Sequence, residues 1–111
     1  MSTAPHLPES DPILQELTHN IKSRLGPALR AIWLFGSRAR GDATPDSDYD
    51  LVVVADGEKR DIEELVVREG YEMTYQHFAL VSTLCYTPDD WELAQNTPLG
   101  RNVRKEGVRL F

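Results

Sequence analysis

One stretch of the chain limits its possible folds more than any other: residues 50–55, which read Asp-Leu-Val-Val-Val-Ala. Three consecutive valines favour a strand because β-branched side chains fit a pleated sheet. Successive side chains of a strand point to opposite faces, so an unbroken apolar run is buried on both. The fold must therefore cover a central strand from two sides, as α/β proteins do with helices.

Helix and strand patterns alternate around this segment. Asp11-Pro12 resembles an N-cap followed by the first helical position, and apolar residues then recur at helical spacing up to Gly26-Pro27. In chain order, the pattern predicts a helix from Asp11 to Leu25, strands over 29–35 and 50–55, a helix over 58–77, a strand over 78–86, helices opened by Thr87-Pro88 and Thr97-Pro98, and a short strand over 108–111. We expect an α/β (α+β) fold, with a small mixed sheet of three to four strands covered by helices.

The length of 111 residues fits one domain, which we place at residues 11–111. Residues 1–10 are rich in Pro, Ser and Thr without a period and are expected to be a flexible lead-in. No apolar run approaches the roughly 20 residues of a membrane helix, and the first residues lack the features of a secretory signal. Cys85 has no cysteine partner and is expected to be a buried apolar residue, so a cytoplasmic location is the simplest expectation.

The chain carries a formal net charge of −6. An acidic protein repels polyphosphate backbones at long range, and no basic stripe dominates the sequence. These properties disfavour non-specific binding to DNA or RNA.

The apolar run over residues 29–35 stops at Gly36-Ser37, where a short helical turn begins. A strand that ends in this way before a helical turn presents free backbone N–H groups at which a phosphate fits. Glycine allows the backbone to approach closely, and the Ser37 hydroxyl adds a donor. Gly36 and Ser37 are therefore candidate phosphate-binding residues, although such a pair alone is most often a simple turn. Arg38 and Arg40 are candidates for phosphate or partner contacts, with surface charge as the alternative.

Two aspartates, Asp48 and Asp50, follow about ten residues after Ser37. Positions i and i+2 of a strand share a face, so the two carboxylates are expected to project together. A cation between them would relieve their mutual repulsion. Asp-x-Asp alone is more often a solvated turn, but beside a phosphate-binding turn it predicts a Mg²⁺–nucleotide site.

This combination resembles the DNA polymerase β-like nucleotidyltransferase superfamily, whose pattern is an apolar residue, Gly-Ser, about ten residues and then Asp-x-Asp. Phe35-Gly36-Ser37 and Asp48-Tyr49-Asp50-Leu51 match that pattern. The longer match, Gly-Ser-Arg-Ala-Arg-Gly and Asp-Ser-Asp-Tyr-Asp-Leu, resembles the minimal nucleotidyltransferases. These are small prokaryotic proteins, often antitoxins paired with a helical HEPN toxin, and the resemblance covers most of residues 29–111.

The resemblance implies that Gly36 and Ser37 hold the triphosphate and that Asp48 and Asp50 bind Mg²⁺. It also implies transfer of a nucleoside monophosphate, here AMP from ATP, onto an acceptor hydroxyl. A chain this short lacks a separate acceptor-binding domain. We therefore expect a homodimer or a stable complex with a helical, HEPN-type protein.

One position departs from the family pattern. Active relatives carry a third carboxylate on the next strand, where it helps to activate the acceptor hydroxyl, but residues 80–86 contain no acid. Ser82 is the best match to that position and is predicted to lie within reach of Asp48 and Asp50. A serine hydroxyl is not a base at neutral pH without an activating partner. Two functions stay open: a nucleotidyltransferase with attenuated turnover, and a nucleotide- or partner-binding module without catalysis.

Overall fold

The computed structural model describes residues 10–111, so the predicted lead-in lies outside the described residues except for Ser10. The elements, in chain order, are α1 (Pro12–Leu25), the 3-10 helix η2 (Gly26–Ala28), β1 (Leu29–Phe35), α2 (Ser37–Arg40), β2 (Tyr49–Ala55), α3 (Lys59–His77), β3 (Val81–Tyr86), α4 (Pro88–Ala94), α5 (Pro98–Glu106) and β4 (Val108–Arg109). No helix among residues 10–111 is long and apolar enough to cross a membrane.

The strands form one sheet in the order β3-β2-β1-β4. β2 pairs with β1 in the antiparallel sense and with β3 in the parallel sense, and β1 pairs antiparallel with β4. The predicted mixed sheet is therefore confirmed, with four strands. β2, the strand with the valine run, occupies an inner position.

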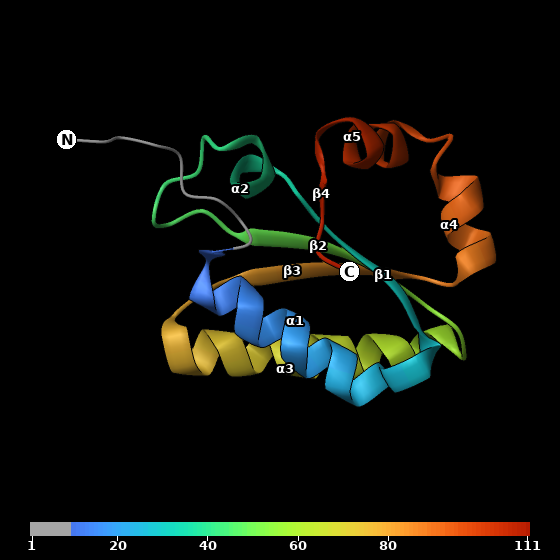
Figure 1. Ribbon diagram of the computed structural model, residues 1–111, viewed down its shortest axis with the longest axis horizontal. Helices are drawn as coiled ribbons and strands as arrows, with labels where there is room; N and C mark the ends of the chain where they lie inside the picture. The colour runs from blue at the N-terminus through green and yellow to red at the C-terminus, as the bar shows by residue number, and fades with distance from the viewer. Residues whose placement is uncertain (1–9) are drawn as a thin grey trace.

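Helices cover the sheet from both sides (Figure 1). One face packs against α1 and α3, and its core includes Leu17, Ile21 and Val53. The other face packs against α4 and α5, and its core includes Val52 and Val103. Val52 and Val53 are adjacent in the sequence, point to opposite faces and are both fully buried, which confirms the two-sided burial expected of this strand.

Capping side chains fix where the helices begin. The Asp11 carboxylate accepts hydrogen bonds from the backbone N–H groups of Ile13 and Leu14, at 2.9 and 3.4 Å. The Thr87 and Thr97 hydroxyls accept bonds from N–H groups in the first turns of α4 and α5. The three predicted helix starts are confirmed, since each combines a polar N-cap with proline at the next position.

Several predicted strand limits were wrong. β3 begins at Val81 rather than at residue 78, because Phe78 is the left-handed C-cap of α3 with φ of 55° and its N–H donates to the Thr74 carbonyl. β2 begins at Tyr49 rather than Asp50, since the Tyr49 N–H already donates to the Leu80 carbonyl at 2.8 Å. β4 ends at Arg109, two residues earlier than expected.

Candidate functional site

The turn between β1 and α2 brings the chain against the carboxylate of Asp50. Gly36 has φ of 76°, a conformation that L side chains rarely adopt. A Cβ added at this position would collide with Oδ2 of Asp50. Glycine is therefore required here for two reasons, the backbone conformation and the close approach of a carboxylate from the neighbouring strand.

The sheet register places Asp50 between β1 and β3 on the face that also carries Val52. Phe35, the last residue of β1, lies opposite Asp50 on one side. Burial raises the pKa of Asp50, repulsion by Asp48 raises it further, and Arg40 lowers it. Asp48 is exposed and lies one residue before β2. Its position is therefore set by the preceding loop and not by the hydrogen bonds between strands. The effect of Asp48 on Asp50 shows that the two carboxylates are close enough to interact.

Ser82 lies directly opposite Asp50 in the parallel pairing of β2 and β3. Its side chain is exposed on the same sheet face, with Leu84 next along the strand. The predicted juxtaposition of Ser82 and Asp50 is thus present in the structure. β3 itself carries no carboxylate, and Ser82 is its residue directly opposite Asp50.

The helical turn after Gly36 supplies hydrogen-bond donors beside these carboxylates. The first backbone bonds of α2 are donated by Ala39 and Arg40 to the Gly36 carbonyl, both at 3.1 Å. The amides of Ser37 and Arg38 precede them, and amides at the start of a helix have no intrahelical acceptor. These amides and the Ser37 hydroxyl are suited to bind phosphate oxygens.

The two arginines of α2 have different surroundings. Arg40 forms ion pairs with Asp42 and Glu106 at 3.3 and 3.7 Å, is partly exposed, and is close enough to Asp50 to lower its pKa. Arg38 is mostly buried, and its guanidinium donates two hydrogen bonds to the Ser47 carbonyl, at 3.0 and 2.8 Å. Arg40 is therefore the arginine whose position suits contact with a phosphate near Asp50, whereas Arg38 holds the loop that precedes Asp48.

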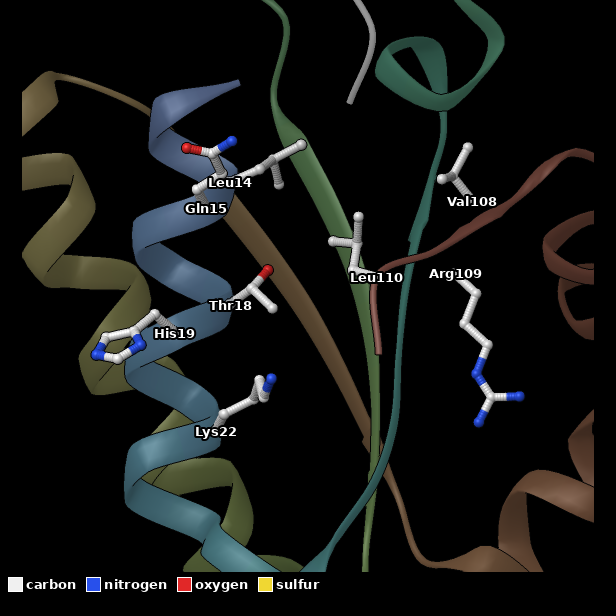
Figure 2. A pocket seen from close by; sticks show the side chains of 8 residues that line it. All are labelled: Leu14, Gln15, Thr18, His19, Lys22, Val108, Arg109 and Leu110. Carbon is white, nitrogen blue, oxygen red and sulfur yellow. The ribbon is translucent and has the colours of Figure 1, made fainter. Parts of the chain in front are cut away.

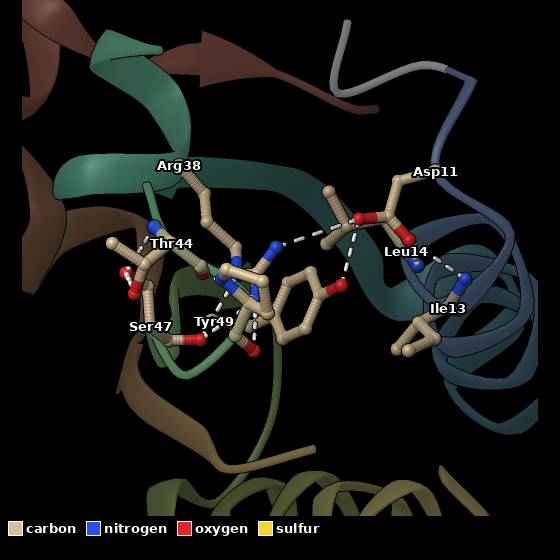
Figure 3. Close-up of polar contacts among 8 residues, drawn as sticks. Asp11, Ile13, Leu14, Arg38, Thr44, Ser47 and Tyr49 are labelled. Atoms are coloured by element: carbon tan, nitrogen blue, oxygen red, sulfur yellow. Dashed lines mark hydrogen bonds and ion pairs between the residues drawn. The ribbon is translucent and has the colours of Figure 1, made fainter. Parts of the chain in front are cut away.

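Arg38 is also stacked within a small polar cluster (Figure 3). Its guanidinium lies 3.9 Å from the centre of the Tyr49 ring and 3.9 Å from Oδ2 of Asp11. The Tyr49 hydroxyl donates a 2.7 Å hydrogen bond to the same carboxylate oxygen. The cluster thus connects the start of α1, the turn after β1 and the residue between the two aspartates.

Tyr49, the residue between the two aspartates, lies in the core. Its contact with Asp11, and that of Arg38 with Asp11, could not be predicted from the sequence. Asp11 lies 38 residues before Tyr49, so no local spacing connects them. The sequence feature that could have predicted the direction of Tyr49 is the alternation of side chains along β2. If Asp50 faces one side of the sheet, Tyr49 must face the other side, toward α1.

The donor set fits Mg²⁺ shared with a nucleotide. Mg²⁺ commonly binds one or two carboxylates and completes its shell with phosphate oxygens and water. Asp48 and Asp50 supply two carboxylates, and among residues 10–111 no group of three or more acidic, histidine or cysteine side chains forms a self-sufficient metal site. These residues therefore suit an ion that arrives with its substrate better than a permanently held structural ion.

One cavity of the described chain lies away from this site. It has a volume of about 510 Å³ and opens between α1 and the strand β4, with Leu14, Thr18, Lys22 and Leu110 in its lining (Figure 2). Leu14 packs in the core between the sheet and α1, which is the face opposite Asp50. A second cavity, of about 430 Å³, borders the loop before Asp48 and includes Ser47 and Leu80.

A family model described as a nucleotidyltransferase domain matches residues 14–97, which include the Gly-Ser turn, both aspartates and Ser82. The chain belongs to this family. This match confirms the nucleotidyltransferase resemblance of the Gly-Ser and Asp-x-Asp motifs.

Two curated proteins of Methanocaldococcus jannaschii are similar to this nucleotidyltransferase domain. Putative protein adenylyltransferase MJ0604 is 26% identical over 98 residues, which cover 88% of this chain and 94% of that protein. Putative protein adenylyltransferase MJ1305 is 37% identical over 90 residues, which cover 78% of this chain and 61% of that protein. This chain therefore spans nearly all of the first relative and about three fifths of the second.

Solved structures share the fold of this nucleotidyltransferase domain. A toxin–antitoxin structure with AMP-PNP has a TM-score of 0.62 at 22% identity, covering 86% of this chain and 70% of that one. A tri-AMPylated HEPN toxin in complex with an MNT antitoxin, from Shewanella oneidensis, has a TM-score of 0.52 at 20% identity and covers 89% and 71% of the two chains.

Proposed function

We propose that this nucleotidyltransferase transfers AMP from ATP to a hydroxyl group of another protein. The observation that carries the proposal is the packing of the Gly36 turn against the Asp50 carboxylate. That packing brings amides suited to phosphate close to Asp50, one of the two carboxylates that we propose hold Mg²⁺. Both curated relatives are named "putative protein adenylyltransferase", and these names support AMP as the group transferred and protein as the acceptor.

The roles of the residues follow from their positions. The amides after Gly36 and the Ser37 hydroxyl bind the β- and γ-phosphates, and Arg40 approaches the same charges. Asp48 and Asp50 hold Mg²⁺, which when bound would neutralise the phosphate charge that grows during transfer. The acceptor oxygen attacks the α-phosphorus in line, the bond to the β-phosphate oxygen breaks, and pyrophosphate leaves. The acceptor hydroxyl gives up its proton to solvent water as the new P–O bond forms.

The acceptor we propose is a helical, HEPN-type toxin, which would make this chain its antitoxin. Support comes from the structural neighbours, one of which is an MNT antitoxin bound to a tri-AMPylated HEPN toxin.

A second function is favoured by one observation, the serine opposite Asp50. Without a third carboxylate, no group on β3 is positioned to take the proton of the acceptor hydroxyl at neutral pH. In that case the protein would bind nucleotide or its partner and act without turnover.

Calorimetry with ATP tests the site. Wild-type protein is expected to bind ATP only with Mg²⁺, and an Asp48→Asn, Asp50→Asn double variant is expected to lose at least about tenfold in affinity, equivalent to about 1.4 kcal/mol. Glu63→Gln, which removes a carboxylate on α3, is the control and should bind as wild type does. Equal binding without metal, or in the double variant, would contradict the site assignment.

Transfer is measured separately from binding. Incubation with ATP labelled at the α-phosphate and a co-expressed HEPN-type protein should leave label on that protein. Metal-dependent binding without incorporation would favour the binding-module function instead.

A further inference from the structure

The strand β3 forms one edge of the sheet, and no segment among residues 10–111 pairs with its outer side. The Leu80 carbonyl accepts a bond from β2, and backbone groups of a strand alternate in direction. The N–H and C=O groups of Ser82 and Leu84 therefore face β2 as well. Those of Val81, Thr83 and Cys85 face outward and are available to another strand.

This edge lacks the features that keep a sheet edge from pairing. Natural proteins protect such edges with charged residues, proline, bulges or very short strands. Residues 78–88 contain no charged side chain, although 27% of the chain is charged, and proline appears only at position 88, where α4 begins. β4, at the opposite edge, is protected by its length of two residues.

Apolar side chains gather beside the same edge. Eight large apolar side chains are exposed among residues 10–111, and six of them lie on α3, on β3 or in the link between them: Val67, Tyr71, Tyr75, Phe78, Leu80 and Leu84. α3 packs beneath β3 (Figure 1), and Val67, Tyr71 and Tyr75 recur one turn apart on its surface. Clustered exposed apolar residues are typical of a protein–protein interface.

We propose that a second copy of this chain covers this surface, with the two β3 strands pairing in the antiparallel sense about a twofold axis. Two copies that each carry a net charge of −6 repel one another, so a stable contact needs a surface without charge. β3 carries no charged side chain, and the two charged groups of α3 near Cys85, Lys59 and Glu63, form an ion pair with each other. Pairing centred on Thr83 sets Thr83 opposite Thr83, a favourable cross-strand pair, and sets no two charged residues opposite each other in the paired strands.

The same pairing has a consequence for the proposed site. Centring on Thr83 sets Ser82 opposite Leu84 of the second copy. Because the axis is perpendicular to the continuous sheet, both Asp50 carboxylates lie on the same face of the dimer. Leu84 of the second copy then borders the side of Ser82 that faces away from Asp50. The dimer interface itself does not depend on nucleotidyl transfer.

Sedimentation equilibrium tests the interface. The wild-type chain is expected to be a dimer. Leu84→Lys places two charges in the interface, and Thr83→Pro removes an outward N–H without touching the bonds to β2. Each change is expected to raise the dimer dissociation constant by about 100-fold or more. Leu93→Lys, the same charge at an exposed leucine on α4, and Thr83→Val, which keeps the N–H, should dissociate as wild type does.

Circular dichroism establishes that each variant is folded, and amide hydrogen exchange then locates the contact. In the wild-type dimer the amides of Val81, Thr83 and Cys85 should exchange slowly, and in Leu84→Lys they should exchange fast. A monomeric wild type, a dimer that survives both edge variants, or fast exchange of these amides in the dimer would each overturn the proposal. A monomer whose edge amides become protected only with a co-expressed helical protein would assign the edge to that protein instead.

Discussion

At the scale of single residues, the site depends on Gly36 because this position has no side chain. Gly36 lets the end of β1 pass directly beside the Asp50 carboxylate, with a backbone φ that other residues rarely adopt. Gly26 also has positive φ, 55°, but an added Cβ there would meet no atom within 4 Å. Alanine at position 26 would therefore meet only the cost of the backbone conformation. Alanine at position 36 would meet that cost and would also displace Asp50.

Gly36→Ala is expected to abolish most ATP binding, and Gly26→Ala is expected to leave it unchanged. Both variants should lose about 1–3 kcal/mol of unfolding free energy, because both force alanine into a strained conformation. Only the alanine at position 36 pushes the carboxylate away from the phosphate-binding turn. Urea unfolding and calorimetry with Mg²⁺–ATP measure the two effects. Normal ATP binding by folded Gly36→Ala would show that the close approach has no role in the site.

At the scale of elements, the register of β3 against β2 decides which residue of β3 lies opposite Asp50. Ser82 is opposite Asp50, and its neighbours Val81 and Thr83 pair with Tyr49 and Leu51, whose side chains lie in the core on the other face. A shift of one residue would exchange the two faces of β3. The register therefore makes Ser82 the residue of β3 best placed to assist the reaction.

Ser82→Asp is expected to raise the rate of nucleotidyl transfer. The new carboxylate would lie beside Asp50 and accept the proton of the acceptor hydroxyl, and general-base assistance is typically worth about 10²–10⁴ in rate. Ser82→Asn, which has the same shape without the charge, is the control and should not gain. The readout is labelled AMP incorporated into the acceptor protein. Fast wild-type transfer that Ser82→Asp leaves unchanged or slows would mean that another residue supplies the base.

At the scale of the whole molecule, the stability of the fold at alkaline pH depends on two buried groups that titrate there, the Cys85 thiol and the Tyr49 hydroxyl. Burial raises the pKa of the Cys85 thiol from 9.0 to about 11. Burial, followed by the hydrogen bond to Asp11, raises the pKa of Tyr49 from 10.0 to about 12. The folded state therefore keeps protons that the unfolded state has already lost, and both groups stabilise the fold fully only below their ordinary pKa values.

The free energy of unfolding is expected to fall as pH rises from about 9 to about 12, because the unfolded state binds fewer protons throughout this range. Cys85→Ala should reduce the slope between pH 9 and 11 by up to about 1.4 kcal/mol per pH unit. Tyr49→Phe should reduce it between pH 10 and 12, whatever its effect on stability at neutral pH. Urea unfolding at a series of pH values measures these slopes, and unchanged slopes in both variants would contradict the assignment.

The features of this protein that depend on residues adjacent in the chain could be predicted from the sequence. Proline after Asp11, Thr87 and Thr97 identified three helix starts, because capping is a local hydrogen bond. The valine run identified the central strand, because side chains alternate along any strand. The Gly-Ser turn and Asp-x-Asp identified the family, because each motif meets a local geometric demand of phosphate or metal binding.

The contacts between segments that are distant in the chain became known only from the tertiary structure. The limits of β3 depended on the left-handed turn at Phe78 and on its pairing with β2, neither of which the apolar pattern of residues 78–86 encodes. The contacts of Arg38 with Ser47 and Asp11 likewise depend on how α1 and the loop before β2 pack together. Pairing register and packing are set by the balance of burial and hydrogen bonding across the whole chain. A residue's neighbours in space therefore cannot be read from its neighbours in sequence.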